Sequence, residues 1–527
     1  MTGSAPHSPA LTDVVARLRA ELGDAVDTSD AALEAARTDR SGHRSAAAPL
    51  AVVRARSTAD VQAACRAAHA TRTPLVTRGA GTGLAGGAVA GAGELVLDLS
   101  GMDRILEVVP EDRVAVVEPG VLNGALNAHL ADHGLWWAPD PASKDISTVG
   151  GNIAMNAGGL LCAKYGVTRE AVLGLEVVLA DGTVLSLGHR TVKGVTGYDL
   201  TALMIGSEGT LGVITQAVLA LRPLVPGAVH TVGAFFPDVT AGAAAAAAIT
   251  RDGLVPAIME LMDEATLAAV RAHAADDDAA RLPETGAFLL VQADGEGAAA
   301  QADRMAELAR AAGGQTTVTA DPVEADRLVA LRRTAFPALE ALGTPLVEDV
   351  AVPRSRMVEM FARIREIERA TGLLIPTTAH AGDGNLHPIL LFGEASRVGG
   401  EGGGEIPAEV WEAAGMLFRA GLELGGTLTG EHGVGLLKRA FLRDELGDAQ
   451  HALQERIKAV FDPHGILKPR QGVHPAAVTA LPALRRSWLP SFRTRNRWNP
   501  RFRAWNSTYS TFESAEALRC VSQAPRP

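Results

Sequence analysis

The chain has 527 residues, 47% of them hydrophobic, and a formal net charge of −11. This length favours two domains, or one domain with a large insertion, and the acidic balance argues against nucleic acid or an anionic membrane as the main partner. No apolar run reaches the roughly 18 residues of a membrane-spanning helix, and the start lacks a signal-peptide pattern. The cysteines, Cys65, Cys162 and Cys520, form no CxxC pair. We therefore expect no iron–sulfur or cysteine zinc site, and a cytoplasmic location.

Residues 1–45 are expected to form a polar N-terminal arm with helical spacing in "LTDVVARLRAEL". The stretches "LAVVRAR", "STADVQAACRAAHATR" and "PLVTRG" then predict a strand, a helix capped by Ser57 or Thr58, and a strand. Such a βαβ unit indicates parallel strands. Two short strands, "ELVLDLS" and "VAVVEPG", follow, and Asp181–Gly182 marks the turn of a hairpin.

From about residue 225, alanine-rich helical stretches alternate with single strands, which predicts a second α+β domain. The stretch 397–405 is expected to be a flexible glycine-rich loop. After Ala476 the chain has nine arginines, no lysine and no periodicity, so 476–527 is predicted to be a disordered tail. The predicted fold class is α+β, divided into an arm at 1–45, domains at 46–224 and 225–475, and this tail.

Three glycine-rich segments lie in the first domain. The first, 77–91, contains a GxGxxG pattern at Gly81, Gly83 and Gly86. A dinucleotide-binding fingerprint requires a helix next, whereas a strand pattern follows, so we disfavour a Rossmann NAD site with Asp98 as the ribose acid. A nest of glycine N–H groups that binds pyrophosphate is the better functional interpretation, and a flexible loop is the alternative.

The second and third segments cover 139–166 and 196–215. The second interleaves polar side chains with glycines, which is typical of backbone pressed against a large polar ligand. The third places Ser207 and Glu208 among glycines. Three such segments in one domain indicate a single extended cofactor.

Two histidines flank a turn in "TAHAGDGNLHP", residues 378–388. A two-residue turn at Asp383–Gly384 would place His380 directly opposite His387, with Cβ atoms about 4.5–5.5 Å apart. The pair is either two metal ligands or a packed pair without an ion. The loop 426–435 offers a carboxylate, Glu431, or an imidazole, His432, as a third ligand, and a helix C-cap with a turn is the alternative.

The three glycine segments resemble the flavin domain of the vanillyl-alcohol-oxidase-type flavoproteins. With "HAGDGNLH" and "GEHGVG", the chain resembles the D-lactate dehydrogenase and glycolate oxidase large-subunit group over about residues 40–470. The resemblance implies a two-subdomain PCMH-type FAD-binding domain, an α+β cap domain, and a C-terminal helical segment that returns to the flavin. The FAD would be non-covalent, because the first segment lacks the histidine to which some relatives attach it.

The resemblance places 77–83 at the pyrophosphate, 139–159 along the isoalloxazine and ribityl chain, and Glu208 and Ile214 near the adenosine. The implied FAD-binding residues are Arg78, Gly79, Ala80, Gly81, Thr82, Gly83, Pro141, Ser147, Thr148, Gly150, Gly151, Asn152, Ala154, Gly158, Glu208, Gly212 and Ile214.

The resemblance also favours a divalent metal, zinc, held by His380, His387 and Glu431, with His432 as the catalytic base. The metal would lower the pKa of a 2-hydroxy acid's hydroxyl, His432 would take the proton, and the Cα hydrogen would pass as hydride to flavin N5. Arg332 would hold the substrate carboxylate, and an exposed helix arginine is the alternative.

The expected substrate is D-lactate or glycolate, because Val347 and Ile389 stand where hydroxyglutarate-type relatives have polar groups. Electrons would leave to a partner protein, a quinone, a cytochrome or oxygen. A homodimer, an iron–sulfur partner subunit and a peripheral place at the inner face of the membrane stay open. So do two rival functions, a zinc-dependent hydrolase and a non-catalytic binding protein. Relatives end with "ILNPGK" where this chain has Lys468 and Arg470, which puts its flavin affinity in doubt.

Overall fold

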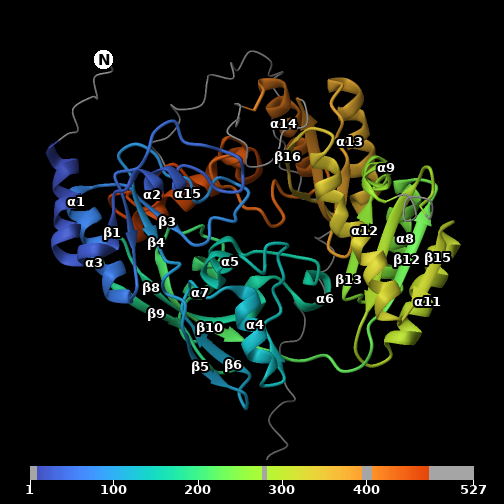
Figure 1. Cartoon of the computed structure of the whole chain (residues 1–527), viewed down its shortest axis with the longest axis horizontal. Helices are drawn as coiled ribbons and strands as arrows, with labels where there is room; N and C mark the ends of the chain where they lie inside the picture. Colours follow the sequence, from blue (N-terminus) through green and yellow to red (C-terminus); the bar gives the residue numbers. More distant parts are fainter. Residues whose placement is uncertain (1–8, 276–281, 394–405, 474–527) are drawn as a thin grey trace, which may run out of the picture. The chain divides into compact units, whose positions relative to one another are not determined.

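The computed structural model describes residues 9–275, 282–393 and 406–473. The predicted flexible loop at 397–405 and the predicted disordered tail lie outside these ranges. No helix among the described residues is long and apolar enough to cross a membrane. The described chain is a mixture of helices and sheets (Figure 1), which confirms the α+β class.

The first domain is built of two small sheets. Its elements are α1 (Pro9–Leu22), β1 (Val26–Asp27), α2 (Asp30–Ala35), β2 (Ala51–Arg54), α3 (Thr58–Thr71), β3 (Leu75–Arg78), β4 (Leu95–Asp98), β5 (Ile105–Val109), β6 (Val114–Val117), α4 (Asn123–Ala131), β7 (Leu135–Trp136), α5 (Val149–Met155), α6 (Cys162–Tyr165), β8 (Val172–Val178), β9 (Val184–Gly188), α7 (Leu200–Met204), β10 (Val213–Ala220) and β11 (Arg222–Pro223).

The first sheet has the order β1-β2-β4-β3, with β2 and β3 both parallel to β4. The predicted βαβ unit is therefore present, and β4 lies between its two strands. Strand β1 comes from the predicted arm and pairs with β2, and α1 packs beside α3 (Figure 1). Val14 and Leu18 of α1 are buried in the same core as Leu75 of β3, so the described part of the arm is integral to this sheet.

The second sheet is antiparallel and has the order β5-β6-β10-β8-β9. The predicted hairpin joins β8 to β9, with Val178 paired to Val184. Its loop has three residues, 180–182, rather than the predicted two, because Leu179 bonds to Thr183 and accepts the N–H of Gly182. The valine-rich strand over 114–117 is present but belongs to this sheet, and the sequence reading missed β5 and α4. Both were short segments without clear periodicity.

The second domain is one large sheet covered by helices. Its elements are β12 (His230–Phe236), α8 (Val239–Arg251), β13 (Ile258–Met262), α9 (Glu264–His273), β14 (Ala287–Ala293), α11 (Ala298–Ala311), β15 (Gln315–Thr319), α12 (Pro322–Glu340), β16 (Thr344–Val347), β17 (Val350–Ala351), α13 (Met357–Thr371), β18 (Thr377–His380), β19 (Asn385–Phe392), α14 (Ala408–Glu423) and α15 (Leu442–Phe461).

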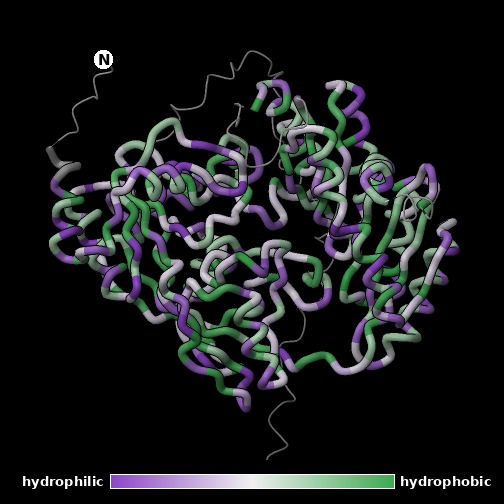
Figure 2. Tube along the Cα trace, in the orientation of Figure 1, coloured by the Kyte–Doolittle hydropathy of each residue, from purple (hydrophilic) through white to green (hydrophobic). Residues whose placement is uncertain are grey.

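The large sheet has the order β15-β12-β14-β13-β18-β19-β16, and β17 also pairs with β19. Successive residues of β14 face opposite sides: Leu289 packs with α8, α11, α13 and α14, whereas Leu290 packs with α9 and α12. Figure 2 shows hydrophobic residues concentrated in the strands, as a sheet covered on both faces requires.

After α15 the chain returns to the first domain. Leu75 of β3 donates its N–H to Ile466 O (2.8 Å) and accepts from Lys468 N (2.9 Å), so this segment extends the edge of the first sheet. The predicted C-terminal helical segment is thus present, and the residues after it reach the first glycine segment.

A buried ion pair holds this return. Lys458 of α15 donates to Thr210 O (2.6 Å) and Leu467 O (2.9 Å) and pairs with Asp462, whose carboxylate accepts the N–H groups of Ile466 and Leu467. Removing one partner of a buried pair leaves an uncompensated charge and is strongly destabilising.

We therefore expect Lys458→Met to lower the free energy of unfolding by about 3–5 kcal/mol. Thermal and urea unfolding of the purified protein measures the change. Arg456→Met, at an exposed position of the same helix, is the matched control and should change stability by no more than about 0.5 kcal/mol. Equal stability of the two variants would show that the pair does not hold this segment.

Candidate active site

A cavity of about 1290 Å³ brings together residues from both domains. All the glycine segments contribute to its wall, as do the two histidines of the hairpin and the loop that carries Glu431 and His432. Of the residues predicted to bind FAD, all line this cavity except Arg78 and Ser147. Segments that are far apart in sequence thus meet around one space large enough for an extended ligand.

The first glycine segment is shaped by Arg78. Its guanidinium donates to Thr38 O (2.8 Å) and Ala88 O (3.1 Å), and a side chain at Gly81, whose φ is +69°, would collide with it. Gly83 differs, because a Cβ there would meet no protein atom within 4 Å. Arg78 therefore organises the loop from behind, and Gly83 presents bare backbone to the cavity. The next element is β4, so the helix that a Rossmann site needs is absent here.

The second glycine segment contains a short helix, α5, where the sequence suggested a loop. Thr148 caps it by accepting the N–H of Gly151 (3.2 Å). A side chain at Gly150 would collide with Pro119, so this glycine is needed for packing inside the protein. Two buried polar atoms here, Ser147 Oγ and Asn152 Nδ2, have no hydrogen-bond partner among the described residues.

Unpartnered buried polar atoms are uncommon in folded proteins. Thr77 Oγ1, at the start of the first glycine segment, is another. Thr77 and Asn152 both line the cavity. Together with the bare backbone at Gly83, they fit a polar, extended cofactor such as FAD.

The third glycine segment contributes Glu208 in an unexpected way. Its two carboxylate oxygens accept the N–H groups of Val434 and Gly435, each at 2.8 Å, so it ties the first domain to the "GEHGVG" loop of the second. Glu208 lines the cavity, but both its oxygens are engaged by the protein. Gly212 is also a packing position, because a side chain there would collide with Val177.

The histidine hairpin differs in register from the sequence prediction. His380 pairs with Asn385, and His387 pairs with Thr378. The connecting loop has four residues, because the N–H groups of Asp383 and Gly384 both bond to His380 O. The prediction of directly opposite histidines was wrong by two residues. A shift of two keeps both side chains on one face, so the imidazoles still meet, with ring centroids 4.9 Å apart.

The two histidines and Glu431 converge on one point. Glu431 Oε1 lies 3.4 Å from His380 Nε2 and 3.1 Å from His387 Nε2, and one ligand atom from each residue lies within 4.8 Å of the other two. Burial opposes charge on His380, but Glu260 and Glu431 outweigh it and raise its pKa well above its ordinary value. Two histidines and a carboxylate are a donor set that suits zinc, so these residues could hold a divalent cation.

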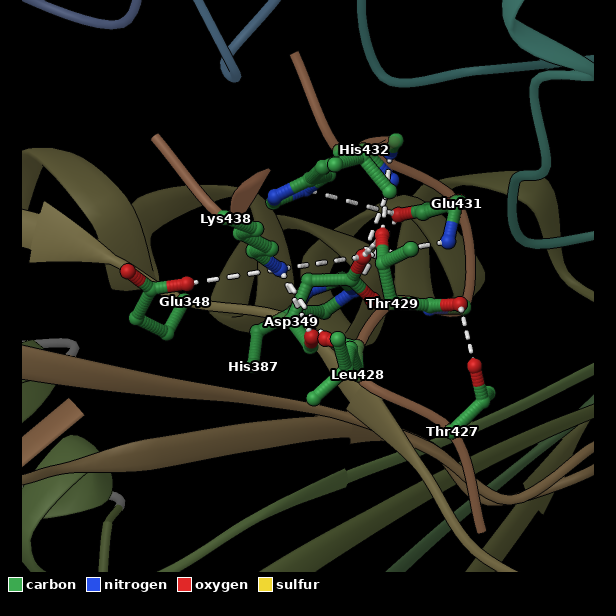
Figure 3. Close-up of polar contacts among 12 residues, drawn as sticks. Glu348, Asp349, His387, Thr427, Leu428, Thr429, Glu431, His432 and Lys438 are labelled. Atoms are coloured by element: carbon green, nitrogen blue, oxygen red, sulfur yellow. Dashed lines mark hydrogen bonds and ion pairs between the residues drawn. The ribbon is translucent and has the colours of Figure 1, made fainter. Parts of the chain in front are cut away.

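A fully buried carboxylate positions the loop that carries Glu431 and His432. Asp349 accepts the N–H groups of Gly430 (2.9 Å), Glu431 (3.1 Å) and His432 (2.9 Å), and also the hydroxyl of Thr429. Figure 3 shows these contacts. The loop backbone thus wraps around one anion.

Lys438 neutralises that anion from the other side. Its Nζ lies 3.7 Å from Asp349 Oδ2 and 3.3 Å from Glu348 Oε2, and it donates to Leu428 O (3.2 Å; Figure 3). Burial alone would raise the pKa of Asp349, but Lys438 and the nearby histidines hold that pKa well below its ordinary value. Asp349 is therefore ionised throughout the neutral pH range.

His432 is a neutral imidazole in this environment. Its ring stacks on His387 with centroids 5.1 Å apart, and its Nδ1 is buried without a partner among the described residues. Burial lowers the pKa of His432 to about 4, against the opposing effect of Asp349. An unperturbed histidine titrates at about pH 6.5. The structure instead keeps His432 unprotonated and able to accept a proton throughout the neutral range.

Arg332 of α12 lines the same cavity, as does its neighbour Arg333. Arg332 Nε bonds to Glu260 Oε2 (2.9 Å), which leaves its terminal nitrogens available for an anion. Val347 and Ile389 are paired across β16 and β19 and also line the cavity. The wall near His380, His387 and Glu431, called the metal-ligand group below because these residues could hold a cation, is therefore partly apolar.

The sequence analysis did not predict that Glu260, Asp349 and Lys438 belong to the site. A signal was present, because Glu260 is a lone charge in the apolar stretch "AIMELM" and Asp349 interrupts "LVEDVAV". A charge inside a buried strand requires a partner and is often functional. Lys468 and Arg470, which differ from the "ILNPGK" pattern of relatives, both make contacts in the folded protein. Lys468 lines the cavity and donates to Gly87 O (2.8 Å), and Arg470 forms an ion pair with Glu94.

Comparison with known proteins agrees with these observations. Residues 49–188 match the FAD binding domain family, and residues 225–471 match the family of FAD linked oxidases, C-terminal domain. The chain is 38% identical to "Glycolate oxidase subunit GlcD" of Bacillus subtilis, over 80% of this chain and 88% of that protein. It is 33% identical to "Probable D-lactate dehydrogenase, mitochondrial" of Danio rerio, over 87% of this chain and 91% of that protein.

Solved structures show the same fold at low identity. p-Cresol methylhydroxylase with substrate bound has a TM-score of 0.69 and 19% identity, and the match covers 88% of this chain and 97% of that one. The 4-ethylphenol oxidase from Gulosibacter chungangensis has a TM-score of 0.69 and 21% identity, covering 90% and 99%. This confirms the PCMH-type architecture. The chain belongs to the FAD-linked oxidases, in the group that includes the glycolate oxidase and D-lactate dehydrogenase flavoproteins, and is an FAD-dependent oxidoreductase.

Proposed function

We propose that this protein oxidises a small D-2-hydroxy acid to the 2-oxo acid, with FAD bound along the glycine segments and a divalent cation held by His380, His387 and Glu431. The observation that carries the proposal is one shared cavity. The metal-ligand group, the anion-binding Arg332 and the glycine segments all line it. Relatives named glycolate oxidase and D-lactate dehydrogenase support this substrate class.

Each side chain in the cavity has a separate role in the proposed reaction. When bound, FAD supplies the hydride acceptor, and a divalent cation supplies a Lewis acid for the substrate oxygens. Arg332 holds the substrate carboxylate through its terminal nitrogens. His432 accepts the hydroxyl proton at Nε2, which lies 3.9 Å from the ligand oxygen of Glu431. Asp349 and Lys438 keep that loop in place while the proton moves.

The wall favours a small or apolar acid. Val347 and Ile389 give no charge partner for a second substrate carboxylate, and Phe336 adds apolar surface. An unpaired carboxylate placed there would lose its hydration without compensation. D-Lactate and glycolate are therefore the proposed substrates.

The electrons must leave the flavin after each turnover. The described residues contain two free cysteines, Cys65 and Cys162, and no cysteine cluster that could hold an iron–sulfur centre. A relative is named as a subunit of glycolate oxidase, which supports a partner subunit as the electron acceptor. A quinone or a cytochrome is the alternative acceptor.

The bare backbone at Gly83 gives a clean test of the FAD site. We expect Gly83→Ala to fold with unchanged thermal stability when flavin-free, because a Cβ there meets no protein atom within 4 Å, yet to bind FAD at least about 10-fold more weakly. Flavin absorbance after gel filtration and fluorescence titration with FAD measure the loss. Full flavin content in this variant would exclude the first segment from the FAD site. Gly81→Val is less informative, because it would also displace Arg78.

The neighbours Glu431 and His432 should differ when substituted. Glu431→Gln removes a ligand charge and should lower zinc content while FAD stays bound. His432→Ala should keep zinc and FAD, and slow flavin reduction by D-lactate by about 10²–10⁴-fold.

Stopped-flow absorbance gives the reduction rates, and metal analysis gives the zinc content. In the wild-type protein the rate should fall only as the pH drops through about 4, where His432 becomes protonated. Loss of zinc from the His432 variant would make that residue a ligand, and reduction at the wild-type rate would place the base elsewhere.

The apolar wall should set the substrate preference. We expect kcat/KM for D-lactate to exceed that for D-2-hydroxyglutarate by about 10²-fold or more, because the wall at Val347 and Ile389 offers no charge partner to a second carboxylate. Steady-state assays with an artificial electron acceptor compare the two acids, with glycolate as a third. A preference for hydroxyglutarate would overturn the assignment of a small acid.

A further inference from the structure

Glu260 is a buried charge that the proposed reaction does not use. It lies in the middle of β13, directly opposite His380 of β18, and is 1% exposed. A carboxylate removed from water to this extent is stable only when its oxygens are satisfied by charged or polar partners. The groups that contact the Glu260 oxygens therefore indicate its role.

The two oxygens of Glu260 bind two different functional groups. Oε1 lies 2.6 Å from Nδ1 of His380, and Oε2 accepts Nε of Arg332 at 2.9 Å. His380 comes from the strand beside Glu260, whereas Arg332 comes from α12, which covers that face of the sheet. One carboxylate thus links the metal-ligand group to the anion-binding arginine.

The bond to His380 selects which ring nitrogen faces the metal-ligand group. A histidine that binds a cation is neutral, and in a neutral ring that donates Nδ1–H to Glu260 the lone pair is on Nε2, which lies 3.4 Å from Glu431 Oε1. A carboxylate behind a histidine ligand also fixes the plane of the ring and makes the imidazole a stronger donor. Glu260 therefore holds His380 in the form that binds a cation.

The bond to Arg332 fixes the direction of the guanidinium. Nε is occupied by Glu260, and Arg332 lines the cavity, so its terminal nitrogens are the groups left to bind an anion there. That arrangement suits bidentate recognition of a carboxylate. The Arg332 side chain is 19% exposed, so it is partly desolvated and its bond to Glu260 is little screened.

We infer that Glu260 is a positioning residue that sets the metal-ligand group and the substrate-carboxylate site in one fixed geometry. This inference rests on the proposed function. A 2-hydroxy acid would meet the cation with its hydroxyl and Arg332 with its carboxylate, so both contacts form together only if the two sites keep their separation. The rival account is that Glu260 serves only as a buried counter-ion for its two neighbours.

Two substitutions distinguish the effect of the length of the Glu260 side chain from the effect of its charge. Glu260→Gln keeps the length of the side chain but replaces one acceptor oxygen by a donor, so it cannot accept from both partners. Glu260→Asp keeps the charge but is shorter by one methylene, so it can satisfy only one partner at a time. If positioning matters, both variants are impaired. If only charge matters, Glu260→Asp behaves like the wild type.

We expect each Glu260 variant to bind both zinc and D-lactate more weakly than the wild type, with FAD content unchanged. Zinc affinity, measured by competition with a chromophoric chelator in the absence of any acid, should fall about 10–100-fold. The KM for D-lactate should rise roughly 10-fold or more. A Glu260→Asp variant with wild-type zinc affinity and KM would overturn the inference, and so would loss of only one of the two properties.

A second pair of variants keeps the test informative if the Glu260 variants do not fold. Arg332→Met frees one end of Glu260 without touching a zinc ligand, so zinc affinity should fall several-fold. The matched control is Arg333→Met, which also lies in α12 and lines the cavity but makes no bond to Glu260, and should leave zinc affinity unchanged or slightly higher. Equal zinc affinities in the two arginine variants would overturn the inference.

These outcomes are distinct from failure of the proposed function itself. A wild-type protein that takes up no zinc, and whose flavin is not reduced by D-lactate, would remove the proposed function. A wild-type protein that does both, while the Glu260 and Arg332 variants match it in zinc affinity, would remove only the role assigned to Glu260.

Discussion

The buried contact between Asp349 and the "GEHGVG" loop is the constraint on which the site depends. Three consecutive N–H groups of the loop point at one carboxylate, and Lys438 balances its charge from the opposite side. A glycine-rich loop has little intrinsic preference for one conformation. The anion supplies that preference, and so it determines where Glu431 and His432 point.

The same loop is also held from the first domain. The N–H of Gly433 donates to Thr429 Oγ1, and Glu208 accepts the two N–H groups after it, those of Val434 and Gly435. One stretch of backbone is therefore fixed by a carboxylate from each domain, and its two reactive side chains face the cavity between these anchors. This explains why Glu208, which lies among glycines of the third segment, is engaged by protein rather than left for the cofactor.

Charge in the site is arranged in matched, mostly buried pairs. Glu260 lies between His380 and Arg332, Asp349 lies between the loop and Lys438, and neither carboxylate contacts bulk water. In such surroundings a charge is costly without a partner, so the pairs favour one arrangement of the side chains over others. His432 has no such counter-charge strong enough to protonate it, and it stays neutral.

The sequence patterns alone predicted the fold class, the glycine segments that line the cavity and the meeting of His380 with His387, and the family resemblance chose Glu431 rather than His432 as the third candidate ligand. Hydrophobic periodicity, glycine clusters and the spacing of His380 and His387 are local patterns, and a register shift of two residues left the histidines on one face because strand side chains alternate. Only the tertiary structure decided the partners of Glu260 and Asp349, because each meets residues from distant segments. It also decided that Arg78 bonds to Thr38 and Ala88 and that Gly150 packs against Pro119, since these contacts depend on which atoms lie behind each segment. The neutral state of His432 was likewise beyond the sequence, because the pKa of a histidine is set by burial and by charges that folding brings near it.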